Sequence, residues 1–252
     1  MKDAKCIWLI VAAFPVFAFL ACQNNAKPDA TAPETSKSDT EILATDDYSY
    51  IPVMEETPNS RTKAELFQFG IDTTAEIPHG LRAGAKAPIF RGEDQNGHPV
   101  SLKNLLSSGP VVLIFYRGQW CGVCNKYLSS IADSLDMIRE KGATVIAVAP
   151  ELAENAKKTV EKTGLAIPVI RDADLRIMKA YGVAFKVNED YQNKIVNYAK
   201  NSIAAMNGMD EAWLPVPATY IINPSGTIGY AFFDYNYRNR LPVAEILESL
   251  DY

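Results

Sequence analysis

The sequence predicts an α/β fold, with a central mixed β-sheet flanked by helices, and three observations support this prediction. Short apolar runs alternate with amphipathic segments from residue 111 to residue 180, as strands and helices do in α/β folds. Two apolar runs joined by Pro224-Ser-Gly226 then indicate a β-hairpin, and a final amphipathic segment indicates a closing helix. The chain has 252 residues, 48% hydrophobic and 22% charged, which suits a buried core and excludes a disordered protein.

The first elements of the compact domain are expected just after Gly84. Residues 87–102 carry a turn at Asn96-Gly97, which predicts a hairpin that leads into a short helix. Residues 111–116 form a continuous apolar run and predict a central buried strand. Within 121–140, apolar residues recur three and four positions apart, which predicts one amphipathic helix that stops at Gly142.

The second half of the domain continues the alternation. Asp172 is placed to cap a helix that runs through Ala180. An insertion at 188–212 is expected to form either a lid or a docking surface. The other elements that we expect are strands over 144–149, 167–170, 219–223 and 227–233, and helices over 151–162 and 243–250.

The N-terminus predicts an exported protein with a lipid anchor. Lys2 and Lys5 precede the apolar run 7–20, which is shorter than the ~20 residues that span a bilayer and is typical of a secretion signal. The run ends in Phe19-Leu-Ala-Cys22, which resembles the lipobox of bacterial lipoproteins. That resemblance implies cleavage before Cys22, lipid on this cysteine, and attachment to a membrane of the bacterial cell envelope, facing outside the cytoplasm. The alternatives are an ordinary signal peptide and an uncleaved anchor.

The chain is therefore expected to have four parts. They are a signal peptide (1–21), a flexible polar tether (22–41), an N-terminal extension with a short helix near 62–69 (42–83), and the folded domain (84–252). The net charge of −5 argues against non-specific binding of nucleic acid, which needs clustered Lys and Arg. Of the four cysteines, Cys6 would leave with the signal and Cys22 would carry lipid, so Cys121 and Cys124 would remain as thiols.

The Cys121-Gly-Val-Cys124 segment carries the predicted chemistry. It follows a strand and a turn at Gly118 and begins a helix, so the two sulfurs lie on one helix face and can form a disulfide. Unpaired amides at a helix start favour the thiolate of Cys121, and Cys124, one turn inward, is expected to be more buried and to act as the resolving thiol. A zinc site would need further ligands, but there is no second CxxC and there are only two histidines. We expect no metal and no cofactor.

Three further residues are weighed as members of this site, each with an alternative. Trp120 either shields the disulfide and contacts a partner, or covers the edge of the core. Arg117 either favours the thiolate by its charge or is a solvated surface residue. Trp213 either reaches the redox site or packs as an ordinary aromatic residue.

The chain resembles the thioredoxin-fold redoxins, and in particular the peroxiredoxin-like branch of the alkyl hydroperoxide reductase/thiol-specific antioxidant family. The resemblance covers residues 84–250 and implies a thioredoxin-like fold. It also implies a cis Pro217 beside the disulfide, although a proline at the start of a strand is the alternative. The segments that carry it are Gly84-Ala-Lys-Ala-Pro88, Tyr116-Arg-Gly-Gln-Trp-Cys-Gly-Val-Cys124 and Leu214-Pro-Val-Pro217-Ala-Thr-Tyr-Ile-Ile-Asn-Pro-Ser-Gly226.

The same resemblance helps to choose between two activities, disulfide exchange and peroxide reduction. In the peroxiredoxin pattern Pro-x-x-x-Thr-x-x-Cys, Arg117 takes the place of the Pro, Cys121 that of the Thr and Cys124 that of the peroxidatic Cys. The later peroxide-binding Arg would fall near Pro217, so both groups that hold peroxide are expected to be missing.

The first interpretation is a thiol–disulfide oxidoreductase that exchanges disulfides with protein partners or a thiol reductant. The alternative is a thiol peroxidase that reduces hydroperoxides and serves as an antioxidant. A third interpretation, a copper carrier, would need a further ligand downstream of the pair, commonly His, whereas His79 and His98 both lie upstream.

Overall fold

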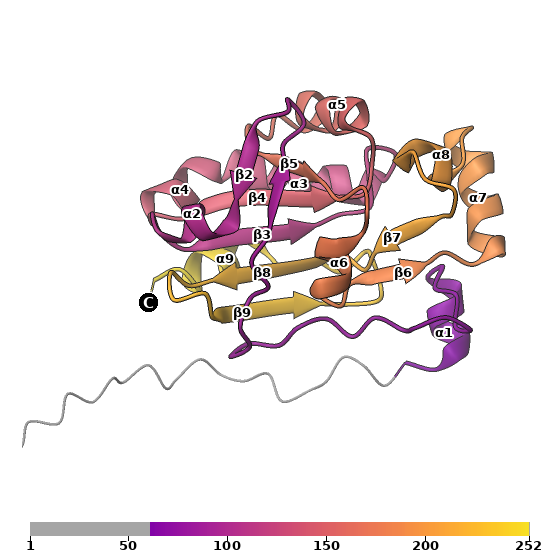
Figure 1. Cartoon of the computed structure of the whole chain (residues 1–252), viewed down its shortest axis with the longest axis horizontal. Helices are drawn as coiled ribbons and strands as arrows, with labels where there is room; N and C mark the ends of the chain where they lie inside the picture. The colour runs from indigo at the N-terminus through magenta and orange to yellow at the C-terminus, as the bar shows by residue number, and fades with distance from the viewer. Residues whose placement is uncertain (1–60, 252) are drawn as a thin grey trace, which may run out of the picture. The chain divides into compact units, whose positions relative to one another are not determined.

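The architecture is a five-stranded mixed sheet with helices on both faces, which confirms the predicted fold class. It comes from a computed structural model of the protein, which describes residues 61–251. The expected signal peptide, tether and lipidation site at Cys22 lie outside these residues. The order of the central sheet is β5-β4-β3-β8-β9, and two further pairs, β1-β2 and β6-β7, stand apart from it (Figure 1).

The described strands and helices have the following bounds. The strands are β1 (Arg91–Glu93), β2 (Pro99–Ser101), β3 (Val111–Phe115), β4 (Thr144–Ala149), β5 (Val169–Arg171), β6 (Ala184–Lys186), β7 (Trp213–Pro215), β8 (Ala218–Ile222) and β9 (Ile228–Phe233). The helices are α1 (Lys63–Gln68), α2 (Leu102–Leu106), α3 (Gly122–Asp133), α4 (Leu135–Glu140), α5 (Ala153–Thr163), α6 (Arg176–Ala180), α7 (Glu189–Ala199), α8 (Ile203–Asn207) and α9 (Val243–Glu248).

Strand β3 occupies the middle of the sheet because every one of its side chains is buried. It runs parallel to β4 and antiparallel to β8, with Phe115 opposite Val148 on one side and Ala218 on the other. The chain that leaves β3 therefore meets the chain that enters β8 at one edge of the sheet. This edge receives the residues 116–121 and Pro217.

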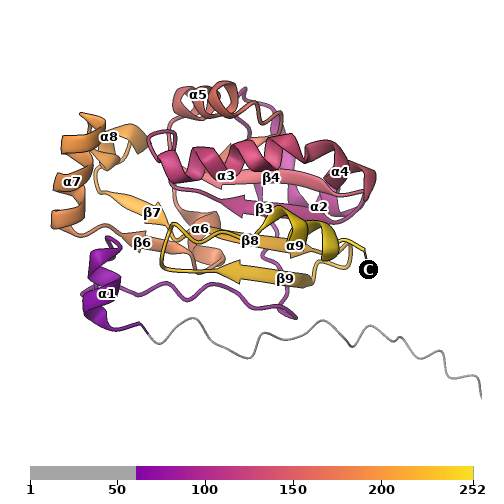
Figure 2. The same ribbon diagram turned by 180° about the vertical axis from the view of Figure 1, so that it is seen from behind.

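Each face of the sheet has its own hydrophobic core. Val112 and Ile114 belong to the core that contains residues of α3, α4, α5 and α9, and Figure 2 shows α3, α4 and α9 in front of the strands. Val111, Leu113 and Phe115 belong to the core that contains residues of α2 and α6. This alternation follows from the period of two in a strand.

The prediction of one continuous helix after Cys121 is wrong. The sequence predicted a single helix over 121–140, whereas α3 ends at Asp133 and α4 begins at Leu135. The amide of Ser134 donates to the carbonyl of Ile131, three residues back, at 3.1 Å, so the last turn of α3 tightens and the helix stops. Ile131 and Ile138 remain fully buried on the two sides of the break.

The insertion after β6 is a folded subdomain with α7 and α8, and the flanking strands β6 and β7 pair with each other. The sequence did not predict this strand pair, because each strand has only three residues and the two lie far apart in the chain. In both ribbon views the insertion stands at the edge of the sheet where β3 ends. It is therefore placed next to the cysteine pair.

Residues 67–71, just after α1, contact this insertion. Thr62 caps α1 in a capping box with Glu65, as expected for the helix predicted near 62–69. The side-chain amide of Asn188 donates to the carbonyls of Phe67 and Ile71, at 2.8 and 3.3 Å. Gly70 has φ +97, and a Cβ there would lie 2.7 Å from the ring of Tyr191, so the chain touches α7 directly.

Among residues 61–251, no helix has the length and apolarity needed to cross a membrane.

Candidate redox site

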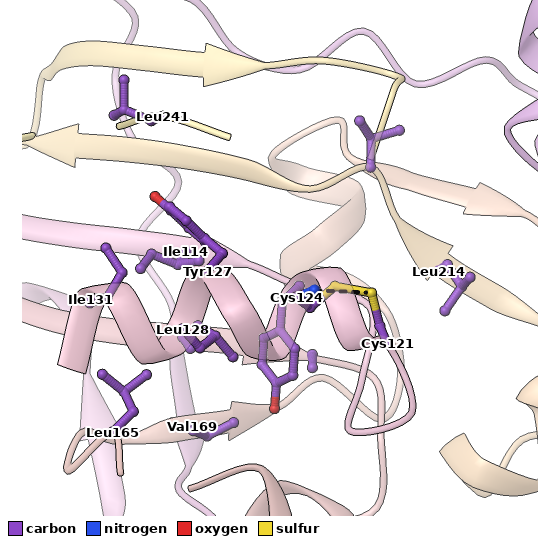
Figure 3. Close-up of a cluster of buried hydrophobic side chains, with 14 of the residues drawn as sticks. Ile114, Cys121, Cys124, Tyr127, Leu128, Ile131, Leu165, Val169, Leu214 and Leu241 are labelled. Atoms are coloured by element: carbon purple, nitrogen blue, oxygen red, sulfur yellow. Dashed lines mark hydrogen bonds between the residues drawn. A yellow bond between two sulfur atoms is a disulfide. The ribbon is translucent and has the colours of Figure 1, made fainter. Parts of the chain in front are cut away.

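The cysteine pair is a disulfide at the N-terminus of α3. Cys121 is the N-cap residue, with φ −84 and ψ 98, and α3 begins at Gly122. The Cα atoms of Cys121 and Cys124 are 5.3 Å apart, within the usual range for a disulfide. The amide of Cys124 donates to the Cys121 sulfur at 3.3 Å, the contact drawn as a dashed line in Figure 3.

The two sulfurs differ in what they face rather than in how deeply they lie. Cys121 is 2% exposed and Cys124 is 0% exposed, so burial alone barely separates them. Cys121 lines an open cleft of about 340 Å³, while Cys124 does not. This cleft therefore offers a partner an approach to the pair from the side of Cys121.

The cleft is formed by three parts of the chain. Trp120 and Cys121 come from the loop before α3, Tyr191, Lys194 and Tyr198 come from α7, and Tyr237 comes from the loop after β9. The insertion thus contributes one complete wall. The insertion was expected to form a lid or a docking surface, and the structure shows that its helix α7 lines the cleft.

Arg117 lies against the Cys121 sulfur. Its Nη2 donates to Sγ at 3.2 Å and its Nη1 donates to the hydroxyl of Tyr191 at 2.6 Å. The guanidinium carbon is 3.5 Å from the ring centre of Tyr237 and 5.1 Å from that of Trp120, so the cation lies among aromatic rings. Arg117 is only 3% exposed, which contradicts the alternative of a solvated surface residue.

A second arginine, Arg240, lies against the Cys124 sulfur. Its Nη2 donates to Sγ at 3.4 Å, and its Nη1 donates to the carbonyls of Tyr237 and Asn239. Burial, together with the nearby charge of Arg117, lowers the pKa of Arg240 to about 10. Arg240 is still a cation at neutral pH, since this value lies well above 7.

Neither guanidinium is paired with a carboxylate of residues 61–251. Within the part of the chain that the structure describes, no Asp or Glu lies within ion-pair distance of Arg117 or Arg240. Buried charges without partners are costly. Two such charges beside one disulfide favour any state of the site that carries negative charge, such as a thiolate.

A buried carboxylate positions the loop that precedes the cysteines. Glu151 follows β4 and accepts hydrogen bonds from the hydroxyl of Tyr116 at 2.5 Å, the amide of Gln119 at 2.7 Å and the hydroxyl of Thr159 at 3.1 Å. Burial raises the pKa of Glu151, and these three hydrogen bonds partly offset the effect. Gly118 has φ +137, and a Cβ there would lie 2.9 Å from Nε1 of Trp120, so the turn requires glycine.

The remaining predicted residues have mixed outcomes. Trp120 is 9% exposed and lines the cleft beside Cys121. Pro217 is buried between β7 and β8, at the sheet edge where β3 ends. Trp213 does not reach the site, because its Nε1 donates to Glu211 and its ring lies 5.1 Å from Nζ of Lys179. No cluster of metal-ligating side chains occurs among residues 61–251.

Four residues of the site were missed by the sequence analysis: Glu151, Tyr191, Tyr237 and Arg240. Tyr191 stood at helical spacing in the insertion, but that spacing does not show which side it faces. Glu151 had a usable signal, since a carboxylate directly after a buried strand stands at the edge where β3 also ends. Arg240 had none, and its contact with Cys124 spans 116 positions.

The fold and the site together define a class. A CxxC disulfide at the start of a helix, at the edge of a thioredoxin-like sheet, is the site of a thiol-dependent redox protein. The AhpC/TSA family model matches residues 83–231, more than half of the chain. The protein belongs to the AhpC/TSA family, which confirms the resemblance noted in its sequence.

The similar proteins include both kinds of thiol chemistry. The peroxiredoxin-type protein bcp of Helicobacter pylori is 27% identical over 173 residues, which cover 68% of this chain and 98% of the relative. The thiol-disulfide oxidoreductase ResA of Bacillus anthracis is 33% identical over 104 residues, but these cover only 41% of this chain and 59% of the relative. These relatives are redox enzymes that act through thiols.

Solved structures agree with the fold. Peroxidoxin BcpB from Mycobacterium tuberculosis superposes with a TM-score of 0.52 at 21% identity, over 68% of this chain and 96% of that one. Peroxiredoxin 6 of Arenicola marina superposes with a TM-score of 0.55 at 17% identity, over 68% of this chain and 73% of that one. At these identities the likeness concerns the fold alone.

Proposed function

We propose that the protein is a thiol–disulfide oxidoreductase that exchanges disulfides through Cys121 and Cys124. One observation carries the proposal: Cys121 lines an open cleft at the start of α3 and Arg117 donates to its sulfur, while Cys124 does not line the cleft. An accessible, charge-stabilised sulfur with a second sulfur in reach is what the exchange reaction requires.

The reaction has two balanced steps. In the reduced protein the Cys121 thiolate attacks a disulfide sulfur of the partner, which forms a mixed disulfide and releases one partner thiolate. The Cys124 thiolate then attacks Sγ of Cys121, which closes the protein disulfide and releases the second partner thiolate. Two electrons pass from the protein to the partner, and the two protons of the original thiols are left for the two released thiols. The reverse sequence oxidises partner thiols.

The arginines support both steps. Arg117 donates to the sulfur that attacks first, and Arg240 donates to the sulfur that resolves the mixed disulfide. In the disulfide, sulfur is a weak acceptor, whereas in a thiolate it receives a charge-assisted hydrogen bond. Each arginine therefore stabilises the reactive form of its own cysteine.

A thiol peroxidase is the second candidate, and Arg240 is the observation that favours it. The sequence predicted that the peroxide-binding arginine near Pro217 is missing, yet Arg240 places a guanidinium 3.4 Å from the Cys124 sulfur. A thiolate would attack the O–O bond to give a sulfenic acid and hydroxide, and the other thiol would then condense with it and release water. Two features count against this candidate: Cys124 does not line the cleft, and Cys121 takes the position of the threonine.

A stopped-flow comparison separates the two candidates. The reduced full chain in detergent is mixed with bis(2-hydroxyethyl) disulfide or with hydrogen peroxide, and fluorescence follows oxidation through Trp120 beside the pair. We expect exchange with the disulfide at a rate above that of a free dithiol, and slow oxidation by peroxide, because losing one aligned donor costs about 10²–10³ in rate. Trp120→Phe identifies the reporter. Peroxide oxidation as fast as that of an efficient peroxiredoxin would overturn the proposal in favour of the second candidate.

We also propose that the protein acts outside the cytoplasm, anchored to a membrane of the bacterial envelope through lipid on Cys22. The support is the basic, apolar and lipobox-like sequence of residues 1–22. Cys22→Ala is expected to release the protein to the soluble fraction or leave it unprocessed, and Cys6→Ala is the matched control. Mature, membrane-bound Cys22→Ala protein would contradict the anchor.

A further inference from the structure

The cleft over Cys121 is positively charged, although the protein as a whole is acidic. The net charge of the chain is −5, yet the residues that line the cleft include Arg117 and Lys194 and no Asp or Glu. Arg240 adds a third cation behind the disulfide. This local charge is opposite in sign to that of the whole chain, so it needs its own explanation.

No ion pair balances this charge among residues 61–251, and Asp234 acts on Arg240 only from beyond ion-pair distance. Arg117 is 3% exposed, and its Nε has no hydrogen-bond partner. Lys194 is exposed on α7, and within residues 61–251 no carboxylate pairs with Lys194, Arg117 or Arg240. A site that keeps buried and rim cations without counter-ions is suited to an anion that arrives from outside.

The rest of the lining is aromatic and the volume is small. Trp120, Tyr191, Tyr198 and Tyr237 surround the cations, and the cleft holds about 340 Å³. Cavities of ~300–1,000 Å³ hold small molecules. Tyr198 is 69% exposed, which leaves one aromatic face free at the rim to cover the carbon chain of a bound molecule.

We propose that the substrate of this cleft is a low-molecular-weight disulfide or thiol that carries carboxylates close to its sulfur. This inference rests on the proposed function and names its substrate class. In this binding mode the sulfur of the substrate lies against Cys121. The carboxylates of the substrate lie near Lys194 at the rim and are attracted by the positive charge of Arg117. Its methylene groups pack against Tyr198 and Tyr237.

The reaction with such a substrate is the balanced exchange already described. The Cys121 thiolate attacks one sulfur of the small disulfide and expels one small thiolate, and Cys124 then closes the protein disulfide and expels the second. The protein loses two electrons and the small disulfide gains them. No further oxidant or reductant takes part.

The test compares three small disulfides that differ in charge. The reduced full chain is mixed with 3,3′-dithiodipropionate, bis(2-hydroxyethyl) disulfide or cystamine, which are anionic, neutral and cationic at pH 7 and each carry the end group two carbons from sulfur. Each rate constant is divided by that for oxidation of dithiothreitol by the same disulfide, because the three leaving thiols differ in intrinsic reactivity. At low ionic strength we expect the anionic substrate to exceed the cationic one by about tenfold, a ratio that shrinks in salt.

Two matched variants locate the effect. Lys194→Glu reverses one charge on the exposed rim of the cleft and is expected to lower the anion-to-cation ratio about threefold or more. Lys157→Glu makes the same change on an exposed position of α5 that does not line the cleft, and is expected to leave the ratio unchanged. Lys157→Glu should also leave the rate with the neutral disulfide at the wild-type value, so it controls for a general effect of reversing one surface charge.

The outcomes distinguish the two levels of the proposal. Equal normalised rates for the three disulfides, or equal effects of Lys194→Glu and Lys157→Glu, would overturn the substrate class while leaving disulfide exchange intact. No reaction above the dithiothreitol reference, even with the neutral disulfide, would overturn the proposed function itself. An anionic preference that Lys194→Glu alone weakens supports the inference.

Discussion

Each sulfur of the disulfide has an arginine, but the two arginines are held in different ways. Arg117 follows the central strand and lies among the rings of Tyr237 and Trp120, with the hydroxyl of Tyr191 on one nitrogen. Arg240 comes from the loop before α9 and is held by backbone carbonyls. One cation is fixed by side chains of the cleft, and the other by the chain behind it.

This difference separates the roles of the two cysteines. The Arg117 side is part of the surface that a substrate meets, since both Arg117 and Cys121 line the cleft. The Arg240 side faces the protein, so Cys124 can react only with a sulfur already bound to Cys121. Equal burial of the two cysteines thus coexists with unequal access, and access decides which one attacks first.

Substitution of the cysteines is expected to give the largest effect. Cys124→Ser should retain the first attack and accumulate a mixed disulfide on Cys121, since nothing resolves it. Cys121→Ser should trap no partner, because Cys124 does not reach the cleft. Turnover should fall by at least about 10³ in both variants. Mass spectrometry of the trapped species decides the order, and mixed disulfides on Cys124 would reverse it.

Substitution of the arginines sharpens the comparison. Arg117→Met should slow alkylation of Cys121 by iodoacetamide at pH 7 about tenfold, because a hydrogen bond to a charged group contributes about 1.5–3 kcal/mol. Arg240→Met should leave this rate nearly unchanged and slow the decay of the mixed disulfide instead. Arg117→Lys keeps the charge but cannot bind Cys121 and Tyr191 at the same time through two nitrogens of one planar group. Its alkylation rate should therefore lie between those of the wild type and Arg117→Met. The same effect of both arginines on alkylation would contradict separate roles.

Substitution of Glu151 is expected to have the smallest effect on chemistry and a distinct effect on stability. Burial raises the pKa of Glu151, so the folded protein holds this proton more tightly than the unfolded chain. That contribution is fully present below pH ~4.5 and is lost as the pH rises through the folded value.

Glu151→Gln should therefore flatten the fall in unfolding free energy above pH ~4.5. It should also cost about 1–3 kcal/mol at low pH, since the amide of Gln119 loses its acceptor. Urea unfolding of the oxidised protein between pH 4 and pH 8 measures both quantities. Thr163→Val, a change in α5 on a residue that does not contact Glu151, is the control for a general loss of packing, and the same pH slope in wild type and Glu151→Gln would refute the assignment.

The parts of the molecule that local sequence encodes were predictable. The apolar run of β4 occupies 144–149 as expected, and α5 ends at Gly164 in the left-handed conformation. The Cys121–Cys124 disulfide also followed from spacing alone. The β6–β7 strand pair did not follow from the sequence, because its three-residue strands pair only when the insertion between them folds.

The environment of the disulfide was less predictable, because it too depends on contacts between segments that are distant in the sequence. Arg117 adjoins the cysteines in sequence, but its burial depends on Tyr191 and Tyr237, which come from distant loops. Arg240 reaches Cys124 only because the chain after β9 returns across the start of α3. Local patterns locate a reactive pair, and long-range packing supplies its charges.

The contact between residues 61–71 and α7 has a practical consequence for anyone who produces this protein. The family match begins at residue 83, and a recombinant domain cut there would lack the carbonyls that bind Asn188 and the Gly70 backbone that supports Tyr191. Tyr191 in turn holds Arg117 beside the sulfur. A fragment trimmed to the family boundary would keep both cysteines and lose the support of their cleft, so an expression fragment should start before Arg61.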